Sequence, residues 1–240
     1  MKVHAGHRLA AMEPEIKRSM LAYYDERANE YDQVYAGEFR GSTDLHRRAY
    51  AADTAAVKQI VRRFAKGSLL DAPCGTAFWL PAYAGNVERI VLMDQSAQML
   101  DRARARVRDA GVDAVASFTQ ADLLSCSWPE QSFDTALAGF FLSHLTSLEI
   151  TAFLTRVGAS LRPEARVIVL DSLWTPLRAE TAQKEGAVRR RLNDGREFDI
   201  YKRYFDAGDI LALAKTSGFH AEIEYVGTAF IAATLRTSTP

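Results

Sequence analysis

The sequence has 240 residues, of which 48% are hydrophobic and 25% are charged, a composition typical of a globular protein that buries a full core. Its 30 basic and 30 acidic residues balance, so no overall charge draws the chain toward nucleic acid or an anionic membrane, and a small-molecule partner is favoured. The apolar runs are far shorter than a membrane span, and the amino terminus lacks the apolar core of a signal peptide. We therefore expect a cytoplasmic protein.

The cysteines and the first histidines give no metal or disulfide framework. Cys74 and Cys126 form no C-x-x-C pair, which favours free thiols. His4 and His7 have the i, i+3 spacing of two metal ligands, but no further ligand is close in the sequence. We therefore expect no metal.

Two helices are expected before strands and helices begin to alternate. Residues 13–32 form the first, and Tyr24 and Tyr31 share one of its faces because they lie seven positions apart. Such an aromatic face could cover a bound cation, or it could simply dock the helix on the core. Residues 43–66 form the second helix, with apolar side chains recurring along one side.

The stretch LLDAPCGTAFWL, residues 69–80, organises the rest of the chain. It predicts a strand that ends at Asp71, a tight loop containing Pro73 and Gly75, and a helix from about Ala77. The free backbone N–H groups at the start of a helix suit an anionic ligand group. Gly75 would let the backbone approach that ligand, because no side chain stands in the way.

A second strand, residues 89–94, also ends in an acid. Asp94 lies 23 residues after Asp71, near the roughly 20 expected for an acid that binds a ribose in a βαβ unit. Ser96 is expected to cap a helix that runs to residue 110. The arginines of residues 102–108 alternate in sequence and so divide between opposite sides of that helix, which predicts a solvated surface.

The remaining elements complete an alternating pattern. Further strands are expected at 112–120, 133–140 and 166–171, a helix at 146–161, a helix capped by Asp206 that ends at 216, and closing strands at 220–226 and 230–236. Five strands alternating with helices predict a parallel, doubly wound α/β sheet. The strand at 133–140 is nearly continuously apolar, as in a strand buried on both faces.

The loop after the first strand resembles motif I of the class I S-adenosylmethionine-dependent methyltransferases. That motif is an acid, an apolar residue and then Gly-Cys-Gly-Thr-Gly. Here Asp71 is the acid, residues 74–76 keep Cys-Gly-Thr, and Pro73 and Ala77 replace the first and last glycines. Proline suits a rigid loop, and we expect alanine to cost little at a helix start.

The resemblance implies a Rossmann-like methyltransferase fold, with a mostly parallel seven-stranded sheet and an antiparallel carboxyl-terminal edge hairpin. We expect one domain over residues 1–240. It would comprise an amino-terminal helical cap at 1–66, a cofactor-binding core at 67–171, a substrate lid at 172–205, and a final helix and hairpin at 206–240. The lid is expected to be irregular because the alternation lapses there.

The resemblance also assigns roles to residues, with S-adenosylmethionine as cofactor and S-adenosylhomocysteine as product. Asp122, after the third strand, would bind the adenine amino group. The expected cofactor-binding residues are Tyr24, Tyr31, Asp71, Ala72, Pro73, Cys74, Gly75, Thr76, Asp94, Gln95, Met99, Asp122, Leu123 and Phe140. The expected substrate-binding residues are Tyr23, Trp174, Arg196, Tyr201 and Tyr204.

His144, in the segment after the fourth strand, is the candidate catalytic residue. It could remove a proton from a hydroxyl acceptor as a general base, or it could only hydrogen-bond a neighbouring loop. The three arginines at 189–191 could be solvated or could meet an acidic substrate. The acceptor, the accepting atom and the oligomeric state stay open.

The function expected from these features is methylation of a small molecule on oxygen or nitrogen. Methyl transfer from a sulfonium is an in-line displacement that an enzyme can promote by alignment and exclusion of water. A nicotinamide-dependent oxidoreductase is one alternative, because Asp94 would serve either ribose, although the loop has one of the three glycines of a dinucleotide fingerprint. A cofactor-binding module without catalytic activity is another.

Overall fold

The computed structural model describes residues 12–39, 41–180 and 182–237. The α-helices are α1 (Pro14–Arg27), α2 (Asp44–Phe64), α3 (Leu80–Tyr83), α4 (Ala97–Asp109), α5 (Ser147–Ser160), α6 (Pro176–Ala179) and α7 (Ala207–Thr216). The 3-10 helices are η1 (Tyr31–Ala36), η2 (Ala84–Asn86), η3 (Asp113–Val115) and η4 (Leu142–His144). The strands are β1 (Gly67–Asp71), β2 (Val87–Asp94), β3 (Ala116–Gln120), β4 (Phe133–Gly139), β5 (Leu161–Ser172), β6 (Glu185–Arg191), β7 (Glu197–Arg203), β8 (Phe219–Val226) and β9 (Phe230–Thr237).

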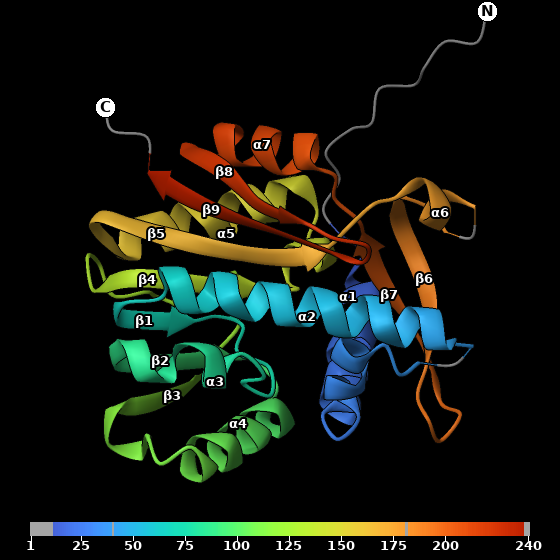
Figure 1. Cartoon of the computed structure of the whole chain (residues 1–240), viewed down its shortest axis with the longest axis horizontal. Coiled ribbons are helices and arrows are strands. Elements are labelled where there is room, and N and C mark those ends of the chain that lie inside the picture. Colours follow the sequence, from blue (N-terminus) through green and yellow to red (C-terminus); the bar gives the residue numbers. More distant parts are fainter. Residues whose placement is uncertain (1–11, 40, 181, 238–240) are drawn as a thin grey trace, which may run out of the picture.

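Seven strands form one sheet in the order β3-β2-β1-β4-β5-β9-β8. The pairs from β3 to β5 are parallel, with Leu70 of β1 opposite Val91 of β2 and Ala136 of β4. The pairs β5–β9 and β9–β8 are antiparallel. This order and this edge confirm the predicted fold class (Figure 1). The strand order reverses beside β1, and ligands bind at such a switch point in open α/β sheets.

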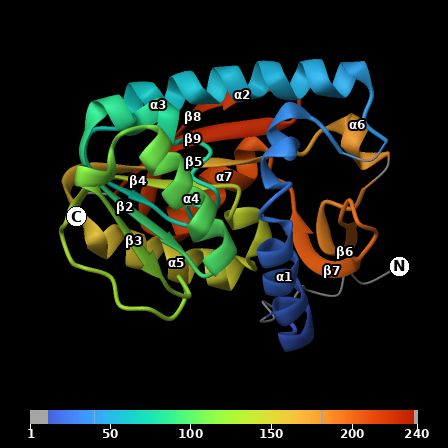
Figure 2. The same cartoon turned by 90° about the horizontal axis from the view of Figure 1, so that it is seen from below.

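Helices cover both faces of the sheet and create two cores. Side chains of α2, α3 and α4 pack on one face, and side chains of α5 and α7 pack on the other (Figures 1 and 2). Strand β4 contributes to both cores, since Leu137 packs in the core under α2, α3 and α4, and Ala136 and Ala138 pack in the core under α5 and α7. The expectation of a strand buried on both faces is confirmed, and it places β4 in the centre of the fold.

The lid differs from its expectation. Residues 172–205, expected to be irregular, contain α6 and an antiparallel hairpin made of β6 and β7. Met20 and Tyr23 of α1 pack against Ile200 and Leu192 on the inner face of this hairpin. As Figures 1 and 2 show, α1 and the hairpin lie together beyond the end of β5. The outer face of the hairpin is charged, which hides the apolar alternation of a strand.

The loop after β1 also differs from its expectation. The helix expected from Ala77 begins at Leu80 and lasts a single turn. Ala77 has φ +55°, a left-handed conformation that costs an L-residue roughly 1–2 kcal/mol. The family's glycine would adopt it without this cost, so the expectation that alanine costs little here is wrong.

None of the helices in the described part of the chain combines the length and apolar character needed to cross a membrane. Within the same residues, no three His, Cys, Asp or Glu side chains gather as metal ligands. His4 and His7 lie outside the described residues.

Candidate active site

A cavity of about 390 Å³ opens at the carboxyl ends of β1, β2 and β4, beneath α1. This size lies in the range of small-molecule sites. The predicted residues that line it are Tyr24, Tyr31, Pro73, Cys74, Gly75, Thr76, Asp94, Gln95, Met99, Asp122, Leu123, Phe140 and His144. These residues lie far apart in the sequence, from α1 to η4, and the fold brings them to one cavity.

Backbone hydrogen bonds hold the loop after β1 between two strands. The N–H of Ala72 donates to the carbonyl of Leu137 at 3.0 Å, and the N–H of Cys74 donates to the carbonyl of Met93 at 2.8 Å. Gly75 has φ +51°, and its N–H donates to Asp94 Oδ2 at 2.9 Å. A positive φ is easy for glycine alone, so this residue lets the loop turn along the cavity.

Asp94 is a buried carboxylate that faces the cavity. Besides Gly75, the N–H of Ser96 donates to its Oδ1 at 2.9 Å. Burial raises the pKa of Asp94 to about 6, although these backbone hydrogen bonds act in the opposite direction. The carboxylate is fixed in orientation and keeps lone pairs for a ligand. Asp122 lines the cavity as well and accepts a hydrogen bond from the N–H of Leu124 at 3.0 Å.

Asp71 and Ala72 do not line the cavity, although we expected them among the cofactor-binding residues. Asp71 is 1% exposed, and its Oδ2 accepts a hydrogen bond from the Tyr83 hydroxyl at 2.8 Å. Alternation along β1 turns this carboxylate to the face that α3 covers. Burial raises the pKa of Asp71 to about 7. The expectation that the acids of the first three strands all face one ligand is therefore wrong for Asp71.

Aromatic rings form one side of the cavity. Tyr35 stacks on Phe78 with ring centroids 4.1 Å apart, and Trp79 lies parallel to Phe140 at 6.1 Å. Burial raises the pKa of Tyr31 to about 12, so this side chain is a neutral phenol. The sequence analysis missed Tyr35, Phe78 and Trp79. Two signals could have found them, the aromatic pair that follows motif I and the position four residues after Tyr31.

His144 lies at the end of the cavity, with both ring nitrogens engaged. Its Nδ1 is 2.9 Å from the backbone carbonyl of Tyr201, and its Nε2 is 2.6 Å from the hydroxyl of Tyr24. A carbonyl only accepts, so Nδ1 carries the proton and Nε2 accepts from Tyr24. Burial, and next the charge of Lys202, lower the pKa of His144 well below its usual value. The ring is thus a neutral base that faces the cavity and also hydrogen-bonds the lid, so both interpretations of this residue describe part of its environment.

A polar network ties the amino-terminal segment to the loop after β1. The Thr76 hydroxyl donates to Asp32 at 2.5 Å, and Arg106 pairs with the same carboxylate at 2.5 Å. Arg106 also donates to the carbonyl of Thr76 at 2.9 Å. The expectation of a solvated surface is wrong for Arg106, because η1 packs against α4 and brings Asp32 to it. In the same way, Asp25 of α1 accepts a hydrogen bond from the Ser96 hydroxyl at 2.7 Å.

None of the five residues expected to bind substrate lines the cavity. Tyr23 is buried between α1 and the lid hairpin. Arg196 is exposed and pairs with Glu26 at 3.0 Å and with Asp194 at 2.8 Å.

The other three, Trp174, Tyr201 and Tyr204, all belong to the lid. Successive strand residues face opposite ways, so Tyr201 points outward and its hydroxyl donates to Glu185. Trp174 and Tyr204 pack together with ring centroids 6.0 Å apart, and neither lines the cavity. These side chains do not line the cavity, and their expected binding of the substrate stays a prediction.

Comparisons with known proteins agree with this architecture. A family model described as a methyltransferase domain matches residues 69–164. The phosphatidylethanolamine N-methyltransferase of Cereibacter sphaeroides is 35% identical over 77 residues, which are 32% of this chain and 37% of that protein. The C-methyltransferase UbiE of ubiquinone/menaquinone biosynthesis from Methylococcus capsulatus is 34% identical over 82 residues, 34% of this chain and 32% of that protein. The chain thus spans less than half the length of these curated relatives.

A solved structure resembles the chain over nearly its whole length. It is described as a DhpI–SAM–HEP complex, with 27% identity, a TM-score of 0.74, and coverage of 94% of this chain and 99% of that one. The similarity extends beyond the core to the amino-terminal helices and the lid. Together with the order of the sheet, these findings support what the loop after β1 indicated, a class I S-adenosylmethionine-dependent methyltransferase.

Proposed function

We propose that this protein binds S-adenosylmethionine in the cavity and transfers its methyl group to oxygen or nitrogen of a small-molecule acceptor. One observation carries the proposal. A single cavity is lined at one end by the loop after β1 with Asp94 and Asp122, and at the other end by the pair Tyr24–His144. Groups that suit an adenosyl ligand and a group that suits proton removal therefore face the same space.

The residues present fit this cofactor. Asp94 has free lone pairs for two ribose hydroxyls, and Asp122 has an acceptor for the adenine amino group. The rings of Tyr31 and Phe140 supply electron-rich faces for a cation. The complex of DhpI with SAM, which resembles this chain over nearly its whole length, supports the same assignment.

The chain itself supplies alignment and a closed environment. When bound, S-adenosylmethionine supplies a methyl group on a sulfonium whose leaving group departs uncharged. Side chains of α1, including Met20 and Leu21, line the cavity opposite the sheet and restrict the access of water. Holding an acceptor in line inside such a cavity lowers the barrier through orientation and desolvation.

Tyr24 and His144 are the residues that we propose for proton removal. The acceptor hydroxyl would give its proton to the Tyr24 oxygen while the Tyr24 proton passes to His144 Nε2, which already accepts from it at 2.6 Å. The resulting imidazolium would keep its Nδ1–H on the Tyr201 carbonyl. Burial raises the pKa of Tyr24 well above its usual value, so phenolate is not the resting form. The neutral imidazole is the base that makes this relay possible.

Binding and product analysis test the proposal. Calorimetric titration of the purified protein should show binding of S-adenosylmethionine and S-adenosylhomocysteine and none of NAD. Mass spectrometry of an acceptor panel should then reveal a compound that gains one methyl group. Binding of NAD alone would replace the proposal by an oxidoreductase. Tight cofactor binding without any methylated product would favour a module without catalytic activity.

The relay has its own test. Tyr24→Phe removes the hydroxyl and keeps the ring, and His144→Asn removes the base. Both should lower kcat for a hydroxyl acceptor by roughly 10²–10⁴-fold, the range of general base catalysis, while S-adenosylhomocysteine binding changes little. Full turnover by His144→Asn, with an unchanged pH profile, would remove the role.

The balanced charge of the chain supports a small molecule over a nucleic acid as acceptor. We propose that the protein acts in the cytoplasm. Salt-sensitive retention of RNA or DNA by the protein would contradict a small-molecule acceptor.

A further inference from the structure

Arg190 occupies an unusual position for a cation. Residues alternate along β6, so Arg189 and Arg191 are exposed on the outer face while Arg190 points inward. Val188 and Leu192, two positions away on either side, join the small apolar cluster under α1. The side chain of Arg190 is therefore directed inward and half-buried, near the tyrosines Tyr23, Tyr24 and Tyr204.

Among the described residues, no carboxylate forms an ion pair with Arg190. Its one hydrogen bond to another side chain there is donated by Nη2 to the Tyr204 hydroxyl at 3.3 Å. The neighbouring Arg189, in contrast, makes a two-bond pair with Asp199 at 2.9 and 3.0 Å. A guanidinium has five donors in a planar fork, so most donors of Arg190 have no partner within the described chain.

The surroundings add positive charge instead of neutralising it. Lys202, on the same face of the hairpin, is buried and donates to Ser143 at 2.7 Å and to Ser172 at 3.0 Å. Its nearest carboxylate, Asp171 at 4.0 Å, already accepts from two backbone N–H groups. A buried charge without a counter-ion is costly. Burial lowers the pKa of Lys202 to about 7, so near neutral pH Lys202 is only partly charged. The net positive charge that an anionic ligand would complete is therefore mainly that of Arg190.

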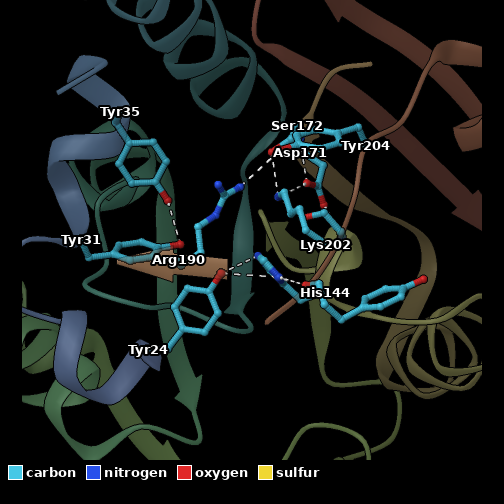
Figure 3. Close-up of polar contacts among 11 residues, drawn as sticks. Tyr24, Tyr31, Tyr35, His144, Asp171, Ser172, Arg190, Lys202 and Tyr204 are labelled. Carbon is cyan, nitrogen blue, oxygen red and sulfur yellow. Dashed lines mark hydrogen bonds and ion pairs between the residues drawn. The ribbon is translucent and has the colours of Figure 1, made fainter. Parts of the chain in front are cut away.

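This positive site adjoins the acceptor end of the cavity. Tyr24 and His144 line the cavity, whereas Arg190 and Lys202 are not among its lining residues. Figure 3 shows Arg190 extending between Tyr24 and Tyr31 on one side and the group around Lys202 on the other. The lid thus places a guanidinium next to the residues proposed to remove the acceptor proton.

We propose that Arg190 binds an oxyanion of the methyl acceptor, so that the acceptor is a small organic anion carrying a carboxylate or a phosphate group. This inference rests on the proposed function, because it concerns the substrate of the same site. The fork of a guanidinium matches two oxygens of such a group. Lys202 would add charge from behind without a direct contact, since its donors are engaged with Ser143 and Ser172. Held at this end, the anion would direct the rest of the acceptor toward Tyr24 and His144.

The test uses the full chain saturated with S-adenosylhomocysteine. Acetate, inorganic phosphate and the neutral compound acetamide are titrated into the wild type, Arg190→Gln and the matched control Arg189→Gln. The wild type and Arg189→Gln should bind one or both anions more tightly than acetamide. Arg190→Gln should weaken anion binding about 10-fold or more, as expected for a lost charged hydrogen bond, and should leave S-adenosylhomocysteine affinity unchanged. Comparison of acetate with phosphate identifies the oxyanion.

Two results separate the two proposals. If the wild type fails to bind S-adenosylhomocysteine, the proposed function is overturned. If S-adenosylhomocysteine binds and Arg190→Gln binds the anions like the wild type, or if the anions bind no better than acetamide, only this inference is overturned. Arg190→Lys provides a second variant that keeps the charge but loses the fork. Its anion affinity should lie between those of the wild type and Arg190→Gln, and affinity equal to that of the wild type would count against recognition by the fork.

Discussion

The protonation state of His144 can be tested through folding stability, independently of any substrate. The imidazole is 7% exposed, and burial lowers its pKa well below 6.5. In the unfolded chain the same group takes up a proton as the pH falls through about 6.5. The unfolded state then binds more protons than the native state, so His144 makes the native state less stable as the pH falls.

The size of this effect follows from the unfolded pKa of about 6.5 and from a buried native imidazole that stays neutral at pH 5.5. At pH 7.5 the unfolded imidazole is almost fully neutral, and the contribution is close to zero. At pH 5.5 it is about ten-elevenths protonated, which stabilises the unfolded state by ~1.4 kcal/mol. His144→Asn removes this titration. The destabilisation caused by the substitution should therefore be ~1.4 kcal/mol smaller at pH 5.5 than at pH 7.5.

Urea unfolding followed by circular dichroism at pH 7.5, 6.5 and 5.5 measures this difference. His220→Asn is the matched control, since His220 is exposed on β8 and does not line the cavity. If the His144→Asn effect were equal at pH 5.5 and 7.5, the imidazole would be protonated in the native state as readily as in water. The relay through Tyr24 would then lose its base.

Three further variants test other parts of the account. Asp94→Asn should weaken S-adenosylhomocysteine binding about 10- to 100-fold. The affinity of the wild type should also fall as the pH drops below about 6, because Asp94 becomes protonated there. Calorimetry should show this fall in the wild type and not in the variant. Arg106→Gln loses its bonds to Asp32 and Thr76, so the Kd for S-adenosylhomocysteine should rise about 3- to 10-fold. The free energy of unfolding in urea should fall by about 1 kcal/mol or less, because the ion pair is partly exposed. An unchanged Kd would contradict the role of Arg106 in holding the loop after β1. In the wild type, the backbone N–H groups of residues 228–230 each lie within 3.0 Å of Asp53 Oδ2. Asp53→Ala leaves all three unpaired, so it should lower the free energy of unfolding by at least about 3 kcal/mol. A loss below about 1 kcal/mol would refute this expectation.

Local signals in the sequence predicted the core of the fold well. Ser96, Thr146 and Asp206 each stand before a periodic segment, and each side chain accepts a hydrogen bond from the third residue of its helix. The continuous apolar run of β4 predicted a central strand because a strand covered on both faces needs apolar residues at every position. Asp94 was located because strand ends and loop spacing determine where a parallel sheet binds its ligand, whereas Asp122 followed from the resemblance to the family.

Features that depend on distant segments were missed. Asp53 belongs to α2 and is buried because its carboxylate meets the turn between β8 and β9, far away in the sequence. Arg106 is paired because η1 folds over α4. The strands β6 and β7 were not predicted, since one face is charged and the other carries Arg190 and Lys202 among apolar residues. Their inward direction follows from the register of the hairpin, which the sequence pattern did not reveal.

A crystal structure of the protein with S-adenosylhomocysteine tests the central claim most directly. The account predicts the adenine beside Asp122, the ribose hydroxyls on Asp94, the carboxylate end of the ligand against the loop containing Gly75, and the sulfur facing Tyr24 and His144. A ligand bound elsewhere on the protein, or one that leaves Asp94 without a contact, would contradict it.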